Sequence, residues 1–208
     1  YAFTAPTGFS GLSQNNYPET GKGIPDFVWI KNRDATDDHQ LYDTTRGVQK
    51  DLNFDSSAAE GTTVDGLQKF LKGGFAIEDD VSVNTVSESY VNYSWVCNGG
   101  TTSANTSATP TIASNFQVND TAGFSIVTYT GTGSAGTVQH GLSKAPEWMI
   151  VKERGNSNGF IVSHKGLTSQ ATYSVNLSNA TAEYSDAGTV YWNNTGPTNK
   201  VFSIDTDS

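Results

Sequence analysis

The stretch PDFVWIKNR, from Pro25 to Arg33, occurs a second time as PEWMIVKER, from Pro146 to Arg154. The two copies align without a gap: a proline, an acid, an aromatic residue, a run of apolar residues, and then lysine and arginine. The second copy starts 146 − 25 = 121 residues after the first. Because self-similarity at a fixed spacing is typical of chains built from repeated units, the sequence predicts two related units.

Each copy has the pattern of a central β-strand. Successive side chains of a strand point to opposite faces, so Phe27 and Trp29 share one face while Val28 and Ile30 share the other. Both faces are apolar, which predicts a strand covered on both sides, and Trp148–Val151 reads the same way. A helix is the alternative for so short a run, but the β-branched and aromatic residues and the flanking proline favour a strand.

The other expected strands are short and separated by turn residues. His39–Asp43 is predicted to form a hairpin with the first copy, and Gly47 to take a positive φ at a turn. For Leu67–Leu71 a helical turn is the alternative. The remaining strands are expected at Leu52–Phe54, Phe75–Ile77, Tyr90–Val96, Phe124–Thr130, Thr137–Val138, Phe160–Val162, Tyr173–Leu177, Val190–Trp192 and Val201–Ile204.

Composition divides the chain into four parts. The segment 98–115 is almost entirely glycine, serine, threonine, alanine and asparagine, which cannot build a core and is typical of a linker or a surface excursion. We therefore predict a lead-in segment at 1–23, a first β unit at 24–98, a Gly/Ser/Thr linker at 99–115, and a second β unit at 116–208.

The second unit is expected to lack one strand. In the first unit, Tyr90–Val96 alternates as a half-buried strand, with Val91, Tyr93 and Trp95 on one face. The sequence stops four residues after Ile204, before an equivalent segment. We expect this strand either beyond Ser208, in a longer polypeptide, or from another chain. Until it is supplied, the second sheet should have a gap or an exposed edge that invites strand addition.

Charge and composition argue against several classes of protein. The net charge is −9 and no lysine or arginine cluster occurs, which argues against a nucleic-acid partner. No run of about 18 apolar residues is present, so no membrane insertion is expected. Cys97 is the only cysteine and is expected to serve packing, because nothing near it in sequence would lower its pKa.

No pattern of catalytic or metal-binding residues stands out. The acidic turn Asp34–Asp38 could gather oxygen ligands for calcium, but it lacks the glycine and distal glutamate of a helix–loop–helix calcium site and favours a solvated turn. His39, His140 and His164 follow no metal-ligand spacing. No nucleophile elbow, phosphate loop or dinucleotide motif occurs, and neither a cofactor nor a catalytic residue is predicted.

The aromatic residues offer one candidate binding position. Sugar-binding surfaces often present exposed tryptophan or tyrosine rings, and Tyr191 and Trp192 lie beside Asn193 and Asn194. We therefore expect one of this pair to be exposed and to contact a glycan, with simple packing as the alternative. By alternation, the other tryptophans are expected in the core: Trp29, Trp95 and Trp148.

From about residue 24 onward the sequence resembles a repeated domain found in structural proteins of marine tailed phages, especially cyanophages. The motifs that carry the resemblance are PDFVWIKNRD at 25–34, YDTTRG at 42–47, GGF at 73–75, YVNYSWVCNGG at 90–100, FSIVTYTGTGSAGTVQHGLSKAPEWMIVKER at 124–154 and YWNNTGPTNKVFSI at 191–204. The resemblance implies lectin-like β-sandwich modules on tail fibres, capsid appendages or adhesins. It brings no catalytic residues with it.

Together these observations predict an all-β chain of two sequence-related, antiparallel β-sandwich-like (lectin- or jelly-roll-like) units. The expected function is that of a non-enzymatic bacteriophage virion protein, a tail fibre or capsid appendage that contacts host surface polysaccharide. The alternatives are a purely structural decoration or connector protein and, second, a polysaccharide depolymerase. Expected partners are other virion proteins and further copies of the chain, with a trimer favoured.

Overall fold

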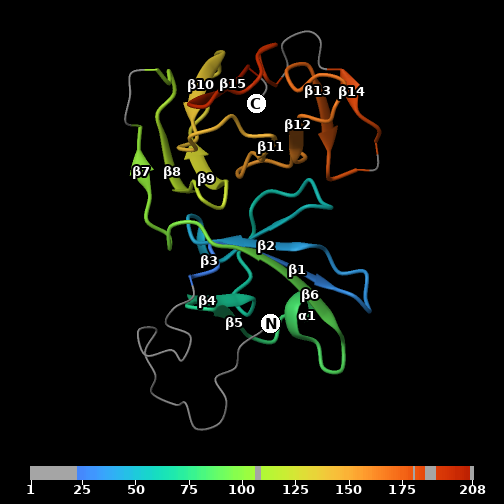
Figure 1. Cartoon of the computed structure of the whole chain (residues 1–208). Coiled ribbons are helices and arrows are strands. Elements are labelled where there is room, and N and C mark those ends of the chain that lie inside the picture. The colour runs from blue at the N-terminus through green and yellow to red at the C-terminus, as the bar shows by residue number, and fades with distance from the viewer. Residues whose placement is uncertain (1–22, 106–108, 180, 186–190, 207–208) are drawn as a thin grey trace. The chain divides into compact units, whose positions relative to one another are not determined.

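The computed structural model describes residues 23–105, 109–179, 181–185 and 191–206. Within these residues the chain forms several small antiparallel sheets and one short helix (Figure 1), which confirms the predicted all-β class. The chain divides into two compact units, Tyr1–Gly100 and Thr101–Ser208. The predicted lead-in at 1–23, apart from Gly23, lies outside the described residues.

The main sheet of the first unit has four strands in the order β3-β2-β1-β6. The stretch that recurs in the sequence forms β1, which lies between β2 and β6 (Figure 1) and confirms the central position predicted for it. The predicted hairpin with the next strand is also confirmed, and Gly47 has the expected positive φ, of 98°. The four strands are β1 (Phe27–Asn32), β2 (Gln40–Asp43), β3 (Gly47–Asn53) and β6 (Tyr90–Trp95).

One face of this sheet forms the core of the first unit. Val28 and Ile30 are at most 2% exposed and pack, with Tyr42 of β2, against the β4–β5 hairpin and helix α1. The helix has one turn, and the side chain of Asp80 caps its first turn by accepting a hydrogen bond from the Ser82 amide. The covering elements are β4 (Leu67–Leu71), β5 (Gly74–Ile77) and α1 (Val81–Asn84).

A buried carboxylate ties the end of β6 to the start of β1. Asp26 has no exposed surface, and its oxygens accept hydrogen bonds from the amides of Cys97 (2.6 Å), Gly99 (3.0 Å) and Gly100 (2.9 Å). The Thr44 hydroxyl donates a fourth, at 2.6 Å. A buried charge is tolerated when hydrogen bonds replace its hydration, and here they hold the turn that follows β6 in place.

The described residues of the second unit form three small sheets. Its core gathers Ile112, Val138, Phe202 and Ile204, with Met149 packed against them. The sheets have the orders β7-β8-β9, β10-β15 and β11-β12-β13-β14. The strands are β7 (Ser103–Ala104), β8 (Ser114–Asn119), β9 (Phe124–Tyr129), β10 (Gly136–Gln139), β11 (Trp148–Val151), β12 (Ile161–His164), β13 (Tyr173–Asn176), β14 (Tyr184–Ser185) and β15 (Val201–Ile204).

The second copy of the recurring stretch is a strand, but it is not covered on both sides. β11 stands at the end of its sheet, and within the described residues it pairs with β12 alone. Met149 and Val151 face the core, while Trp148 is 55% exposed and Ile150 is 36% exposed. The prediction of a central strand is therefore wrong for Trp148–Val151, whereas the prediction of an exposed edge in the second unit is confirmed for the described part of the chain.

The two hairpins that begin with β1 and β11 have matching registers. Phe27 pairs with Asp43, and Trp148 pairs with His164. Each residue of the second pair lies 121 residues after the corresponding residue of the first pair. The lysines near the ends of the two strands also form equivalent hydrogen bonds. Lys31 Nζ donates to the carbonyls of residues 32 and 35 at 2.6 and 3.0 Å, and Lys152 Nζ to those of residues 153 and 156 at 2.7 and 2.9 Å.

Smaller differences from the predicted strands follow from packing. Leu67–Leu71 is a strand, not a helical turn, because it pairs with β5. The short strand β7 lies inside the segment expected as a linker, and β8 begins before that segment ends. Tyr191 and Trp192 form no strand, and the neighbouring Val190 lies outside the described residues.

Candidate functional site

Aromatic side chains line one face of the first sheet and reach solvent at its β6 side. Phe27 pairs with Trp95 and Trp29 with Tyr93 across the β1–β6 ladder, with ring centroids 5.6 and 5.1 Å apart. Phe54 stands edge-on to Trp29, at 5.1 Å. We call Phe27, Trp29, Phe54, Tyr93 and Trp95 the aromatic face. Its outer members remain open to solvent, since Tyr93 is 49% and Trp95 37% exposed.

This exposure corrects the expectation that Trp95 belongs to the core. Alternation correctly places Val91, Tyr93 and Trp95 on one face of β6, but β6 is the last strand of its sheet. The rings of Tyr93 and Trp95 therefore pack on Trp29 and Phe27 with one side only. Trp148, also expected in the core, is exposed for the same reason, because β11 ends its own sheet.

A histidine holds the central ring of the aromatic face. The indole Nε1 of Trp29 donates a hydrogen bond of 2.8 Å to Nδ1 of His39. In this arrangement Nδ1 of His39 is the hydrogen-bond acceptor, which leaves Nε2 as the ring's donor. The main chain of His39 is anchored in turn, since its amide donates to Asp55 (2.9 Å) and its carbonyl accepts from Asn53 (3.2 Å). Trp29 is thus fixed by packing and by a hydrogen bond, which preorganises the surface next to it.

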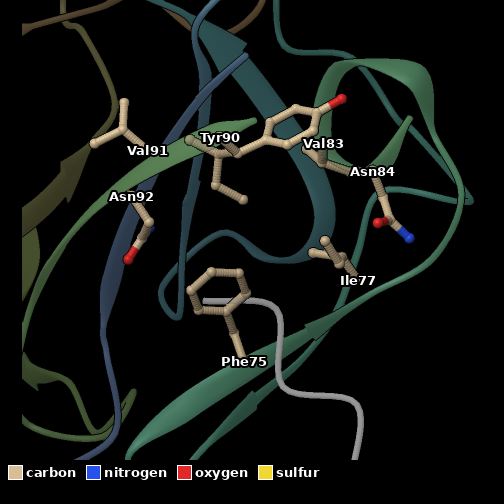
Figure 2. A pocket seen from close by; sticks show the side chains of 8 residues that line it. Phe75, Ile77, Val83, Asn84, Tyr90, Val91 and Asn92 are labelled. Atoms are coloured by element: carbon tan, nitrogen blue, oxygen red, sulfur yellow. The ribbon is translucent and has the colours of Figure 1, made fainter. Parts of the chain in front are cut away.

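The opposite face of the same sheet carries an open pocket of about 250 Å³ between β5, α1 and β6. Figure 2 shows Phe75, Ile77, Val83 and Tyr90 around it. Asn84 and Asn92 also line it, but their amide nitrogens donate to the carbonyls of Glu78 (2.8 Å) and Trp29 (3.2 Å). The pocket therefore presents mainly apolar surface and no group placed for chemistry.

The two residues predicted to contact a glycan lie in different environments. Trp192 is 2% exposed, and its indole Nε1 donates a 2.8 Å hydrogen bond to the Ser174 hydroxyl of β13. Its ring is part of the interior and offers no face to a sugar, so it is removed as a candidate. Tyr191 is half-buried, and its carbonyl accepts from the Asp205 amide at 3.0 Å. Tyr191 alone retains a partly exposed ring at this position.

The carboxylates of the acidic turn bind their own surroundings. Asp34 accepts from the Ser89 amide at 2.5 Å, and Asp37 accepts from Asn32 at 2.7 Å. Asn32 is itself buried and also donates to Glu88. These bonds join the turn to the segment that leads into β6. Among the described residues, no group of three or more histidine, cysteine or acidic side chains is arranged to hold a metal ion.

His140 is buried at the end of β10, and both of its ring nitrogens contact main-chain groups. Its Nε2 lies 3.1 Å from the Thr198 carbonyl, and its Nδ1 accepts from the Leu142 amide at 3.2 Å. These partners fit a neutral ring with the proton on Nε2. Burial lowers the pKa of His140, and the hydrogen bond to Thr198 opposes this only in part. In the second unit, burial likewise raises the pKa of the Tyr129 hydroxyl to about 12.

A family model described as a domain of unknown function (DUF7483) matches residues 4–208, which is nearly the whole chain. The chain belongs to the DUF7483 family. No curated protein and no solved structure gave a match. Membership of this family assigns no activity. Across the described residues, no helix has both the length and the apolar character needed to span a membrane.

Proposed function

We propose that this DUF7483 chain is a non-enzymatic surface protein of a tailed-phage virion, a tail fibre or capsid appendage, that contacts host surface glycans through the aromatic face. The observation that carries the glycan contact is the exposure of Tyr93 and Trp95 beside a fixed Trp29. The virion setting is supported by the resemblance of the sequence motifs.

The chemistry of the aromatic face suits a sugar ring. Tryptophan and tyrosine combine a large apolar surface with a polar tip, which is useful where a partner is flat and partly wet. Exposed apolar residues that gather in one place, as Tyr93 and Trp95 do, mark binding surfaces more often than scattered ones. Since Trp29 is held by His39, little side-chain entropy is lost on binding, which favours affinity.

The two units are, in this proposal, copies of one β-sandwich-like module. Support comes from the equal register of the hairpins and from the equal hydrogen bonding of Lys31 and Lys152. Such modules commonly bring several binding surfaces together by self-association, and a trimer is the assembly we favour. Multivalent contact then raises the avidity for a repeated host polysaccharide without any new contact within one chain.

A glycan array probed with the wild-type chain and with Tyr93→Ala/Trp95→Ala tests the glycan contact. We expect binding by the wild type and at least a ~tenfold loss in the double variant, because each exposed ring contributes on the order of 1 kcal/mol. Trp148→Ala, which removes a more exposed tryptophan from the other unit, is the matched control and should bind normally. Equal binding by the double variant would remove the aromatic face as the glycan site.

A second experiment separates the proposed role from its rivals. Gold-labelled antibodies to this chain should decorate the tail or capsid of particles of the phage that encodes it, and their absence from particles would end the virion proposal. Decorated particles together with no glycan binding and unchanged adsorption would favour a purely structural decoration or connector protein. Release of sugars from host envelope material would instead identify a depolymerase.

A further inference from the structure

The backbone of β11 has one side that no strand of the described chain covers. The Lys165 amide donates to the Glu147 carbonyl at 2.8 Å, which makes this row a hydrogen-bonded one. Bonded rows alternate along an antiparallel ladder. Met149 and Val151 therefore direct their amides and carbonyls toward β12, while Trp148 and Ile150 direct theirs toward the open side.

This open edge lacks the features that usually prevent strand addition. Natural edge strands are protected by charged residues, proline or a bulge. β11 consists of Trp148, Met149, Ile150 and Val151, has no charge or proline, and pairs with β12 without a register shift. The outward side chains Trp148 and Ile150 are 55% and 36% exposed. An added strand would bury them and satisfy the free backbone groups at the same time.

The first unit shows what such an edge accepts. There, β6 covers β1 in antiparallel register, with Phe27 opposite Trp95 and Trp29 opposite Tyr93. After β6, the chain turns at Gly99 and Gly100, whose amides donate to the buried Asp26.

Glu147 occupies the position of Asp26 in the second unit. Its side chain is 66% exposed and pairs with Lys165 at 2.5 Å. The acid is present, but within the described residues no glycine turn with free amides meets it.

We propose that the open edge of β11 binds an antiparallel β-strand from a separate polypeptide. This strand has aromatic or apolar residues at alternate positions and a glycine turn directly after it. The alternate side chains lie beside Trp148 and Ile150, as Trp95 and Tyr93 lie beside Phe27 and Trp29. The amides of the turn donate to the Glu147 carboxylate. This is binding by β-augmentation, and it does not depend on the proposed virion role.

A synthetic peptide with the sequence of residues 90–100, in which serine replaces Cys97, is the probe. Its binding to the full chain is measured by fluorescence anisotropy. Ile150→Pro removes an amide on the open side without removing a bond to β12, and edge strands tolerate such a proline. Ile150→Thr changes the side chain but keeps the amide, and serves as the matched control. We expect saturable binding to the wild type, and binding about tenfold or more weaker to Ile150→Pro than to Ile150→Thr.

A second measurement uses only the wild-type chain, so that it stands even if Ile150→Pro does not fold. With a spin label at the end of the peptide, NMR signals from β11 should broaden more strongly than those from β1. Absence of binding, equal binding by Ile150→Pro, or stronger broadening at β1 than at β11 would each overturn the proposal. A further outcome would also overturn it: the chain self-associates, Ile150→Pro abolishes this self-association, and no peptide binds. The edge would then pair with a second copy of the same chain.

Discussion

β1 and β11 have nearly the same sequence pattern and the same pairing with the strand that follows, yet they end in opposite positions. β1 lies between two strands, and its outward aromatic residues pack against Tyr93, Trp95 and Phe54. β11 lies at the end of its sheet, and Trp148 and Ile150 are exposed. The difference comes from β6, which follows β1 by about 60 residues of chain. A strand's own sequence thus determines its conformation, whereas its burial depends on a distant segment.

The acidic residues that precede the two strands differ in burial in the same way. Asp26 has no exposed surface and accepts four hydrogen bonds. Glu147 is largely exposed, and Lys165 beside it lowers the pKa of its carboxyl group. Equivalent positions in the sequence therefore carry a structural carboxylate in one unit and a surface ion pair in the other.

The largest effect is expected from removing the buried carboxylate. Asp26→Ala leaves the buried Cys97 amide and the amides of the glycine turn without their acceptor, and the first unit should lose roughly 3 kcal/mol of its free energy of unfolding. Glu147→Ala, the matched change in the second unit, should leave the free energy of unfolding of that unit almost unchanged. Denaturant titrations followed by hydrogen exchange in each unit measure both. Similar losses from the two variants would show that the contrast between the acids is false.

A smaller difference is expected from pH. The pKa of His140 is lower in the folded chain than the ordinary value of 6.5, so the unfolded chain binds more protons as the pH falls below that value. The second unit should therefore lose stability from about pH 6.5 down to the depressed pKa of His140. Melting curves at successive pH values, resolved by unit, check this.

His140→Asn provides the control for the pH experiment. It should flatten the pH dependence of the second unit and leave the melting curve of the first unit unchanged, because His140 belongs to the second unit and the substitution alters no side chain of the first. A pH dependence that persists in His140→Asn would contradict the assignment to this histidine.

The strands and hairpins could largely be predicted from sequence, because they depend on local patterns. Phe27–Ile30, its hairpin with Gln40–Asp43 and the positive φ of Gly47 all follow from alternation and turn chemistry. The candidate site could not be predicted in this way. Alternation shows that Tyr93 and Trp95 share a face, but which face is covered depends on the order of strands in the sheet. Trp192 is buried and donates its indole hydrogen bond to Ser174, in a strand 18 residues earlier that no local pattern places beside it.

Residue-resolved hydrogen exchange of the chain alone tests the contrast between β1 and β11 most directly. In β11, the amides of Trp148 and Ile150 should exchange on the order of a hundredfold faster than those of Met149 and Val151, since only the latter two direct their amides toward β12. In β1, Phe27 to Ile30 should all be protected, because β2 and β6 bind alternate residues. Uniform protection along β11 would show that its outer side is already covered, and would contradict an open edge at this strand.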